Sequence, residues 1–100
     1  MLDPAVVEWL GGEDMEPRLE FSAAQARVKA LKHRPNNPDL LELYALFKQG
    51  TDGDVRGKRP RLMDVKGRAK FDAWAGKRGM NFDEARTEYV ALVERLLQNQ

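Results

Sequence analysis

Residues 43–74 read LYALFKQGTDGDVRGKRPRLMDVKGRAKFDAW, and this stretch decides the fold. In its first and last parts, apolar residues recur three and four positions apart, as they do on one face of a helix. The segment between them, residues 51–66, contains Gly53, Gly57 and Pro60 and has no sustained helical pattern. A connection of this length is uncommon unless it has a function. The stretch therefore predicts two helices joined by a functional loop.

Helical periodicity continues on both sides of this stretch. The expected helices cover residues 19–33, 37–50 and 67–78, with a fourth from residue 81 onward. Asn37 is suited to cap the second helix, with Pro38 at its first position, and Asn81 and Glu84 can form a capping box for the fourth. No segment alternates apolar and polar residues for long enough to predict a strand. We therefore expect an all-α fold, a four-helix bundle with a long loop between its second and third helices.

Each expected helix has an apolar face that a core could bury. These faces are Phe21, Ala24, Val28 and Leu31 in the first helix, Leu40, Leu43, Tyr44 and Phe47 in the second, Ala69, Ala73 and Trp74 in the third, and Ala85, Tyr89, Leu92, Val93 and Leu96 in the fourth.

The length and composition are those of one small globular domain. The chain has 100 residues, of which 42% are hydrophobic and 33% are charged. Residues 1–20 contain six acidic residues and one basic residue. We therefore divide the chain into an acidic N-terminal extension, residues 1–18, and a ligand-binding domain, residues 19–100.

The absence of cysteine excludes several kinds of chemistry. It excludes disulfides, thiolate metal ligands and cysteine nucleophiles, and it fits a reducing cytoplasm. The N-terminal residues show neither a secretory signal nor an apolar run long enough for a membrane anchor. A cytoplasmic location without stable membrane insertion is therefore expected.

The middle of the chain is basic although the whole carries a formal charge of only +1. Residues 48–78 contain ten basic and four acidic residues, a net charge of +6. Clustered cations attract an anionic ligand, although a solvated surface would have the same composition. Nucleic-acid binding is the alternative function that this region raises, and the interleaved acidic residues argue against it.

The other motifs in the sequence do not predict a metal site or a catalytic site. Asp52-Gly53-Asp54 is similar to the start of a calcium loop, but Arg56 and Lys58 follow it and no distal glutamate completes it. The single histidine, His33, has no cysteine or second histidine that would indicate zinc. No nucleophile elbow, phosphate-binding loop or dinucleotide fingerprint occurs, so we expect neither an enzyme nor a metal protein.

Residues 43–74 are similar to the corresponding part of the acyl-CoA-binding protein family. The matching elements are Leu43-Tyr44, Lys48-Gln49, Thr51, Gly53-Asp54, Arg59-Pro60, Asp64, Lys66-Gly67, Ala69-Lys70 and Asp72-Ala73-Trp74. Weaker agreement extends the resemblance over about residues 20 to 96 without a gap. The resemblance implies a monomeric, non-enzymatic carrier of long-chain fatty acyl-CoA, which needs no cofactor and passes its ligand to enzymes that use acyl-CoA.

The resemblance also implies a role for particular residues. Tyr44, Lys48 and Lys70 would hold the 3′-phosphate of coenzyme A, and Phe47 and Tyr89 would flank the adenine. The remaining contacts would come from Lys29 and, along the acyl chain, from Leu40, Leu41 and Ala69. The spacing of Tyr44 and Lys48 agrees with this, because residues four apart project from the same face of a helix. Phe47 stands where the family usually has tyrosine, so it can stack but cannot donate a hydrogen bond.

Overall fold

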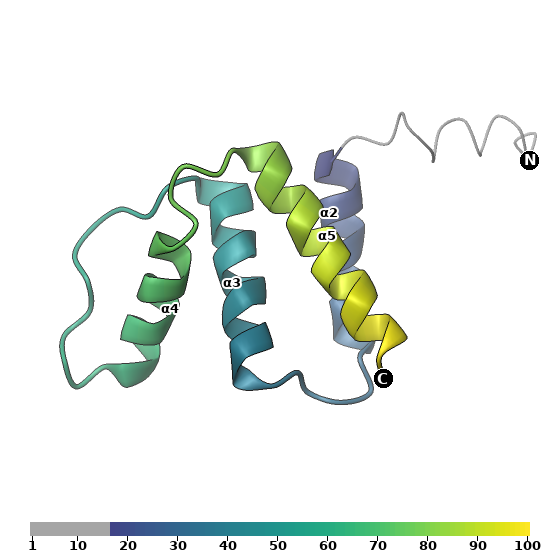
Figure 1. Ribbon diagram of the computed structural model, residues 1–100, viewed down its shortest axis with the longest axis horizontal. Helices are drawn as coiled ribbons and strands as arrows, with labels where there is room; N and C mark the ends of the chain where they lie inside the picture. The colour runs from purple at the N-terminus through teal and green to yellow at the C-terminus, as the bar shows by residue number, and fades with distance from the viewer. Residues whose placement is uncertain (1–16) are drawn as a thin grey trace, which may run out of the picture.

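The computed structural model describes residues 17–100 and contains four α-helices and one 3₁₀-helix in this range. With the labels of Figure 1, these are α2 (Pro17–Arg27), η1 (Val28–Ala30), α3 (Asn37–Asp52), α4 (Val65–Ala75) and α5 (Phe82–Gln98). The predicted all-α fold with four helices is confirmed. The predicted extension, residues 1–18, lies outside the described residues except for Pro17 and Arg18, which begin α2.

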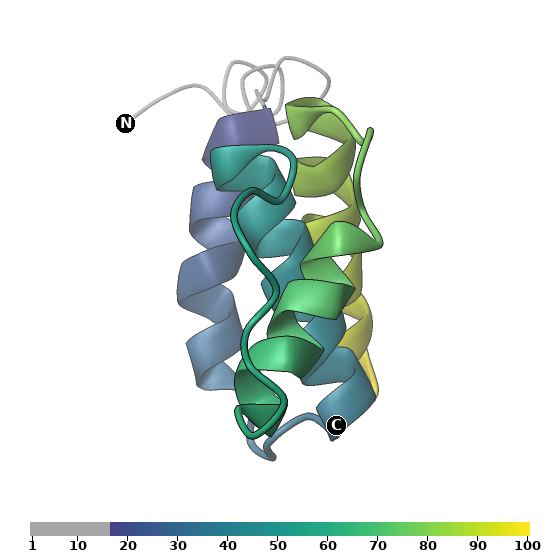
Figure 2. The same cartoon turned by 90° about the vertical axis from the view of Figure 1, so that its left-hand side faces the viewer.

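Helix α3 lies at the centre of the bundle. It packs against α4 on one side and against α5 on the other, and α2 packs against α5. Figures 1 and 2 show that α3 and α4 run in the same direction, upward in both views. A short turn cannot join two parallel neighbours, so the connection over residues 53–64 has to return along the bundle (Figure 2). This accounts for the long loop that the sequence predicts.

The core forms where α2, α3 and α5 meet. Its buried members are Phe21, Ala24, Leu43, Leu46, Tyr89, Leu92 and Val93. Leu46 and Val93 are among the largest side chains that are completely enclosed. The predicted inner face of the last helix is confirmed for Ala85, Tyr89, Leu92 and Val93, which are buried, whereas Leu96 is only half-buried against the core.

The predicted inner face of the central helix is only partly correct. Leu43 is buried, but Leu40, Tyr44 and Phe47 are only half-buried. The enclosed positions include Leu46 and Gln49 instead, because α3 has neighbours on two sides and its core face is turned toward α5. The half-buried stripe is therefore left at the surface, where it can line a groove.

The third helix also differs from the prediction. It covers Val65–Ala75 rather than residues 67–78, and none of its residues is buried. Asp64 caps it by accepting a hydrogen bond from the Gly67 amide at 2.9 Å. Ala69, Ala73 and Trp74 are half-buried rather than enclosed, since α4 packs mainly against α3.

The ends of the first two helices also need correction. The first helix tightens into η1 and ends by residue 30, because Leu31 is extended and the Lys32 amide donates at 2.6 Å to Gln100 Oε1 instead of to a helical carbonyl. The cap of α3 is Asn36, not Asn37, and its side chain accepts from the Asp39 amide at 2.9 Å. The capping box at the start of α5 is present as predicted.

A buried glutamine holds both connections next to α4. Gln49 is completely enclosed, and its Nε2 donates at 2.8 Å both to Asp54 Oδ1 and to the Met80 carbonyl. Asp54 Oδ1 also accepts from the Gly79 amide at 2.8 Å. Hydrogen bonds from Gly79 and Gln49 to the charged carboxylate lower the pKa of Asp54 from its ordinary value of 3.8. One side chain thus fixes the chain before α4 and the chain after it.

Three further contacts hold the loop against the bundle. Trp74 Nε1 donates at 2.8 Å to the carbonyl of Gly53, whose φ of 80° favours glycine. Val55 is buried at 7% exposure, and Arg59 forms a two-point ion pair with Asp72 at 2.8 and 2.6 Å. The long connection is therefore an ordered part of the fold.

Replacing Gln49 by alanine should lower the free energy of unfolding by about 2–4 kcal/mol, because two enclosed hydrogen bonds are lost and a cavity is left. Urea unfolding followed by circular dichroism measures the change. Gln98→Ala, at an exposed position of α5, is the matched control and should change stability by less than about 0.5 kcal/mol. If both variants unfold at the same urea concentration, Gln49 does not hold the two connections.

Candidate functional site

The first candidate cavity is a groove along the segment that leads from the end of α2 to α3. It has a volume of ≈ 560 Å³, and residues of η1 and of the connection to α3 form one wall. Leu43, Tyr44 and Phe47 form the other wall, and Tyr89 of α5 also lines the groove. Lys29 lies on the η1 side. We call this cavity the α2–α3 groove.

A second cavity of ≈ 450 Å³ lies on the other side of the half-buried stripe, between α3 and α4. Leu40, Leu41 and Tyr44 line it from α3, and Ala69 and Lys70 line it from α4. We call it the α3–α4 groove. The two grooves share Arg34, Leu40 and Tyr44, so they adjoin along the exposed edge of α3. Volumes of this order are typical of ligand sites.

The charges around both grooves have one sign. The cations that line them are Lys29, Arg34, Lys66 and Lys70, and the lining residues include no carboxylate. The remaining lining side chains are largely apolar or aromatic. Such a surface is suited to a ligand that has an anionic part and an apolar part.

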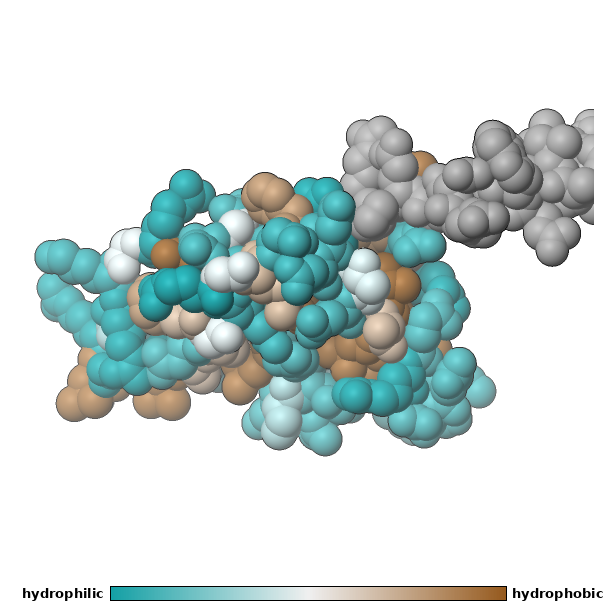
Figure 3. Space-filling model, turned by 45° about the horizontal axis from the view of Figure 1, so that its top comes forward, coloured by the Kyte–Doolittle hydropathy of each residue, from teal (hydrophilic) through white to brown (hydrophobic). Residues whose placement is uncertain are grey.

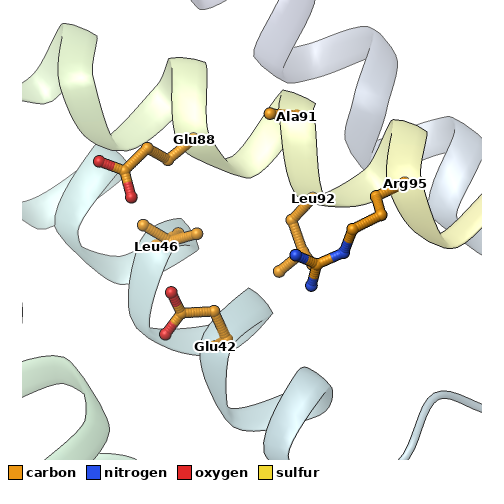
Figure 4. Close-up of a pocket in the computed structure, with 6 residues that line it drawn as sticks. All are labelled: Glu42, Leu46, Glu88, Ala91, Leu92 and Arg95. Carbon is orange, nitrogen blue, oxygen red and sulfur yellow. The ribbon is translucent and has the colours of Figure 1, made fainter.

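A third hollow, of ≈ 300 Å³, lies between α3 and α5 and has a different character. Figure 4 shows the side chains of Glu42, Glu88 and Arg95 around Leu46 and Leu92. Two carboxylates against one guanidinium give a net negative lining, which disfavours an anionic ligand. We therefore assign the candidate site to the two cation-lined grooves.

Tyr44 and Lys70 meet across the α3–α4 groove. Lys70 Nζ lies 5.5 Å from the centroid of the Tyr44 ring, within the range of a cation–π contact. The structure thus brings together two residues that are 26 positions apart in the chain and that the sequence assigns to one anion site.

Lys48 lies one helical turn beyond Tyr44 and lines neither groove. Its Nζ is 4.8 Å from the centroid of the Trp74 ring, and it forms an ion pair with Asp52 on its own helix. Its side chain is 26% exposed, so an anion can still reach it. A ligand phosphate would have to replace Asp52 as the partner of Lys48.

Two aromatic rings, Phe47 and Tyr89, line the α2–α3 groove, and the buried ring of Phe21 packs against both. Phe21 packs edge-on against Tyr89 at 5.0 Å between centroids, and it lies 6.0 Å from Phe47. Tyr89 is only 5% exposed, and this burial raises the pKa of its phenol from the ordinary value of 10.0. Phe47 is half-buried and offers a ring to the groove.

Eight of the nine residues that the sequence assigns to the site line one of the two grooves, and Lys48 is the exception. Contact with a ligand stays a prediction for all nine. Three further polar residues of the lining were not predicted from the sequence: Arg34, which lines both grooves, and Lys66 and His33, which line one each. A signal for Arg34 was present, because it continues a run of basic residues through Lys29 and Lys32.

Residues 17–100 contain no group of three or more histidine, cysteine or acidic residues that is placed to hold a metal ion. In the same range, every helix is too short or too polar to cross a membrane.

The fold defines a small helical bundle with two adjoining, cation-lined grooves along α3. The family model described as "Acyl CoA binding protein" matches residues 18–93. The chain is 53% identical over 79 residues to "Acyl-CoA-binding protein homolog 1" of Caenorhabditis elegans, an alignment that covers 79% of this chain and 92% of that protein.

Solved structures agree with this match. The crystal structure of Oryza sativa Acyl-CoA-Binding Protein 2 superimposes with a TM-score of 0.79 at 36% identity, covering 83% of this chain and 92% of the rice chain. The protein of that family from Moniliophthora perniciosa gives a TM-score of 0.77 at 35% identity, with 82% and 81% covered. The chain belongs to the acyl-CoA-binding protein family.

The burial of Tyr89 predicts a loss of stability at high pH. Since the folded phenol has a raised pKa, the unfolded chain releases this proton more readily, and the free energy of unfolding should fall as the pH rises above about 10. Tyr89→Phe should reduce this fall and remove a late-titrating phenol from the ultraviolet absorbance titration. Tyr44→Phe, at the other tyrosine of the chain, is the control. Identical curves for the wild type and Tyr89→Phe would contradict the prediction.

Proposed function

We propose that this protein binds long-chain fatty acyl-CoA esters reversibly and carries them between the enzymes that make and use them. One observation supports this above the others: two adjoining grooves, lined by cations and apolar side chains, meet at Tyr44 in a member of the acyl-CoA-binding protein family. The ligand has the same two parts, a phosphorylated nucleotide and a hydrocarbon chain.

The 3′-phosphate would bind at the seam between α3 and α4. Tyr44 offers a hydroxyl donor, and Lys70 lies beside it with an ammonium group. Lys48 would turn from Asp52 toward the phosphate, which carries more negative charge than a single carboxylate. Arg34, which borders both grooves, can add a fourth donor. Each charge-assisted hydrogen bond is worth about 1.5–3 kcal/mol.

The adenine would lie in the α2–α3 groove. Phe47 offers its ring face there, and the loss of the tyrosine hydroxyl limits it to stacking. Tyr89 is too enclosed to be a stacking partner on its own and would instead form part of the groove surface beneath the base. Lys29 on the opposite wall would contact the phosphates.

The acyl chain would follow the α3–α4 groove. Leu40, Leu41 and Ala69 provide the apolar lining, and all three are half-buried, so they keep surface for a ligand. Each methylene that leaves water contributes about 0.8 kcal/mol. Affinity would therefore rise with chain length.

The same proposal describes a monomeric binding domain, residues 19–100, that acts in the cytoplasm and catalyses no reaction. The two grooves hold donors and apolar walls but no paired acid and base, and the absence of cysteine fits a reducing compartment. The contacts with acyl-CoA-using enzymes would be transient. The alternative raised by the basic middle of the chain, nucleic-acid binding, finds no support in the matched family.

The chain-length dependence can be measured by calorimetry. If the groove buries only about four methylenes of the palmitoyl chain, palmitoyl-CoA should bind roughly a hundred-fold more tightly than acetyl-CoA. Leu41→Ser should weaken palmitoyl-CoA about ten-fold and leave acetyl-CoA unchanged, whereas Leu19→Ser, at an exposed position of α2, should affect neither ester. Equal affinities of the wild type for the two esters would remove the acyl path from the proposal.

The phosphate contacts can be separated from the fold by a ligand lacking the 3′-phosphate. Lys48→Ala or Lys70→Ala should weaken palmitoyl-CoA binding about ten- to a hundred-fold. The melting temperature should be nearly unchanged, because Lys48 is only half-buried and Lys70 is exposed. With the 3′-dephospho analogue, both variants should bind like the wild type.

Lys58→Ala, in the loop and outside both grooves, is the matched control. An effect that persists in full with the dephospho analogue would show that the lysine does not contact this phosphate.

A further inference from the structure

Three large apolar side chains point into solvent where the long loop meets α4. Leu62, Met63 and Val65 are 75%, 90% and 72% exposed, the highest values among the exposed large hydrophobic residues of the described chain. We call these three residues the apolar tip. Figure 3 shows brown atoms protruding at the lower left edge, the side on which the loop and α4 lie in Figure 1. Contiguous exposed apolar surface is a mark of interaction sites.

The apolar tip is held in place and does not belong to a loose segment. A turn closed by the bond from the Asp64 amide to the Arg61 carbonyl, at 2.9 Å, puts Leu62 and Met63 at its corner. Asp64 also caps α4, and Arg59 ties the preceding residues to Asp72. The fold therefore holds the segment in an arrangement that leaves these side chains exposed.

The surroundings of the apolar tip are strongly basic. Residues 55–68 contain six basic residues and one acidic residue, a net charge of +5. The guanidinium of Arg59 is engaged by Asp72, whereas Arg56, Lys58, Arg61 and Lys66 are exposed around the loop. Apolar side chains that project from a segment rich in exposed cations match the two layers of an anionic membrane surface, its charged headgroups and the hydrocarbon beneath them.

The apolar tip is continuous with one of the grooves. Val65 and Lys66 line the α3–α4 groove, so this groove opens beside the tip. A bilayer that received Leu62 and Met63 would lie against the groove's mouth. This orientation, which rests on the proposed function, would shorten the path of an acyl chain between the protein and the membrane.

We propose that the apolar tip and its cations form a docking surface for anionic lipid bilayers, on which the protein binds peripherally. A second copy fits this surface poorly, because it would bring together two copies of residues 55–68, each with a net charge of +5. A nucleic acid fits it poorly as well, because aliphatic side chains offer no ring for base stacking.

Flotation of the full chain with vesicles tests the docking surface without any acyl-CoA, so the result does not depend on the proposed ligand. Vesicles of equal parts phosphatidylcholine and phosphatidylserine should bind at least ten-fold more protein than vesicles of phosphatidylcholine alone. Lys58→Gln and Arg61→Gln should each lower binding about five-fold. Leu62→Asp combined with Met63→Asp should lower it at least ten-fold. High salt should weaken binding by the wild type.

Two matched variants serve as controls. Leu19→Asp changes an exposed leucine on α2, and Arg78→Gln changes an exposed arginine on the connection before α5, so both should bind within about two-fold of the wild type. Circular dichroism melts establish that all variants are folded, and the single-charge variants keep the test valid if the double variant unfolds.

Three outcomes would overturn the proposal. The first is a wild type that does not float with anionic vesicles, and the second is a set of tip and control variants that float equally. The third is a wild type that does not bind vesicles but sediments as a dimer, together with a tip variant that sediments as a monomer. The occupant of the surface would then be a second copy. Loss of acyl-CoA binding would contradict the proposed function but would leave the vesicle result standing.

Discussion

The position of α4 depends on the hydrogen bonds of one enclosed side chain, Gln49. Because α3 and α4 are parallel, no tight turn can join them, and the chain reaches and leaves α4 through a connection at each end. Gln49 and the carboxylate of Asp54 fix both connections at once, through Met80 and Gly79. The α3–α4 groove exists because this arrangement holds α4 at a set place beside α3.

The two faces of α3 have different environments. Leu46 faces α5 and is enclosed, whereas Leu40, Tyr44 and Phe47 remain half-buried along the edge of two grooves. A helix with neighbours on both sides can have a core and a binding surface at the same time. The apolar stripe that is most evident in the sequence lines the two grooves to which we assign the ligand.

Charge is separated across the bundle in a way that agrees with this division. The acidic and basic side chains that line the two grooves are all cations, whereas two glutamates, Glu42 and Glu88, line the hollow between α3 and α5. Lys48 contacts Asp52 of its own helix and Trp74 of α4, so it already has partners at the seam between α3 and α4. The loop extends the basic surface as far as the apolar tip, and headgroup and ligand recognition would then use neighbouring parts of one surface.

The sequence by itself determined the helical class, the number of helices, the long loop and the capping box of Asn81 and Glu84, because these depend on residues a few positions apart. It also indicated the family and eight residues that line the grooves. The tertiary structure decided that Leu46 is enclosed, that Arg34 borders both grooves and that Lys48 lies over Trp74. These facts depend on which helices are neighbours and on how each is turned, and spacing along a single helix does not specify contacts between residues that are distant in the chain.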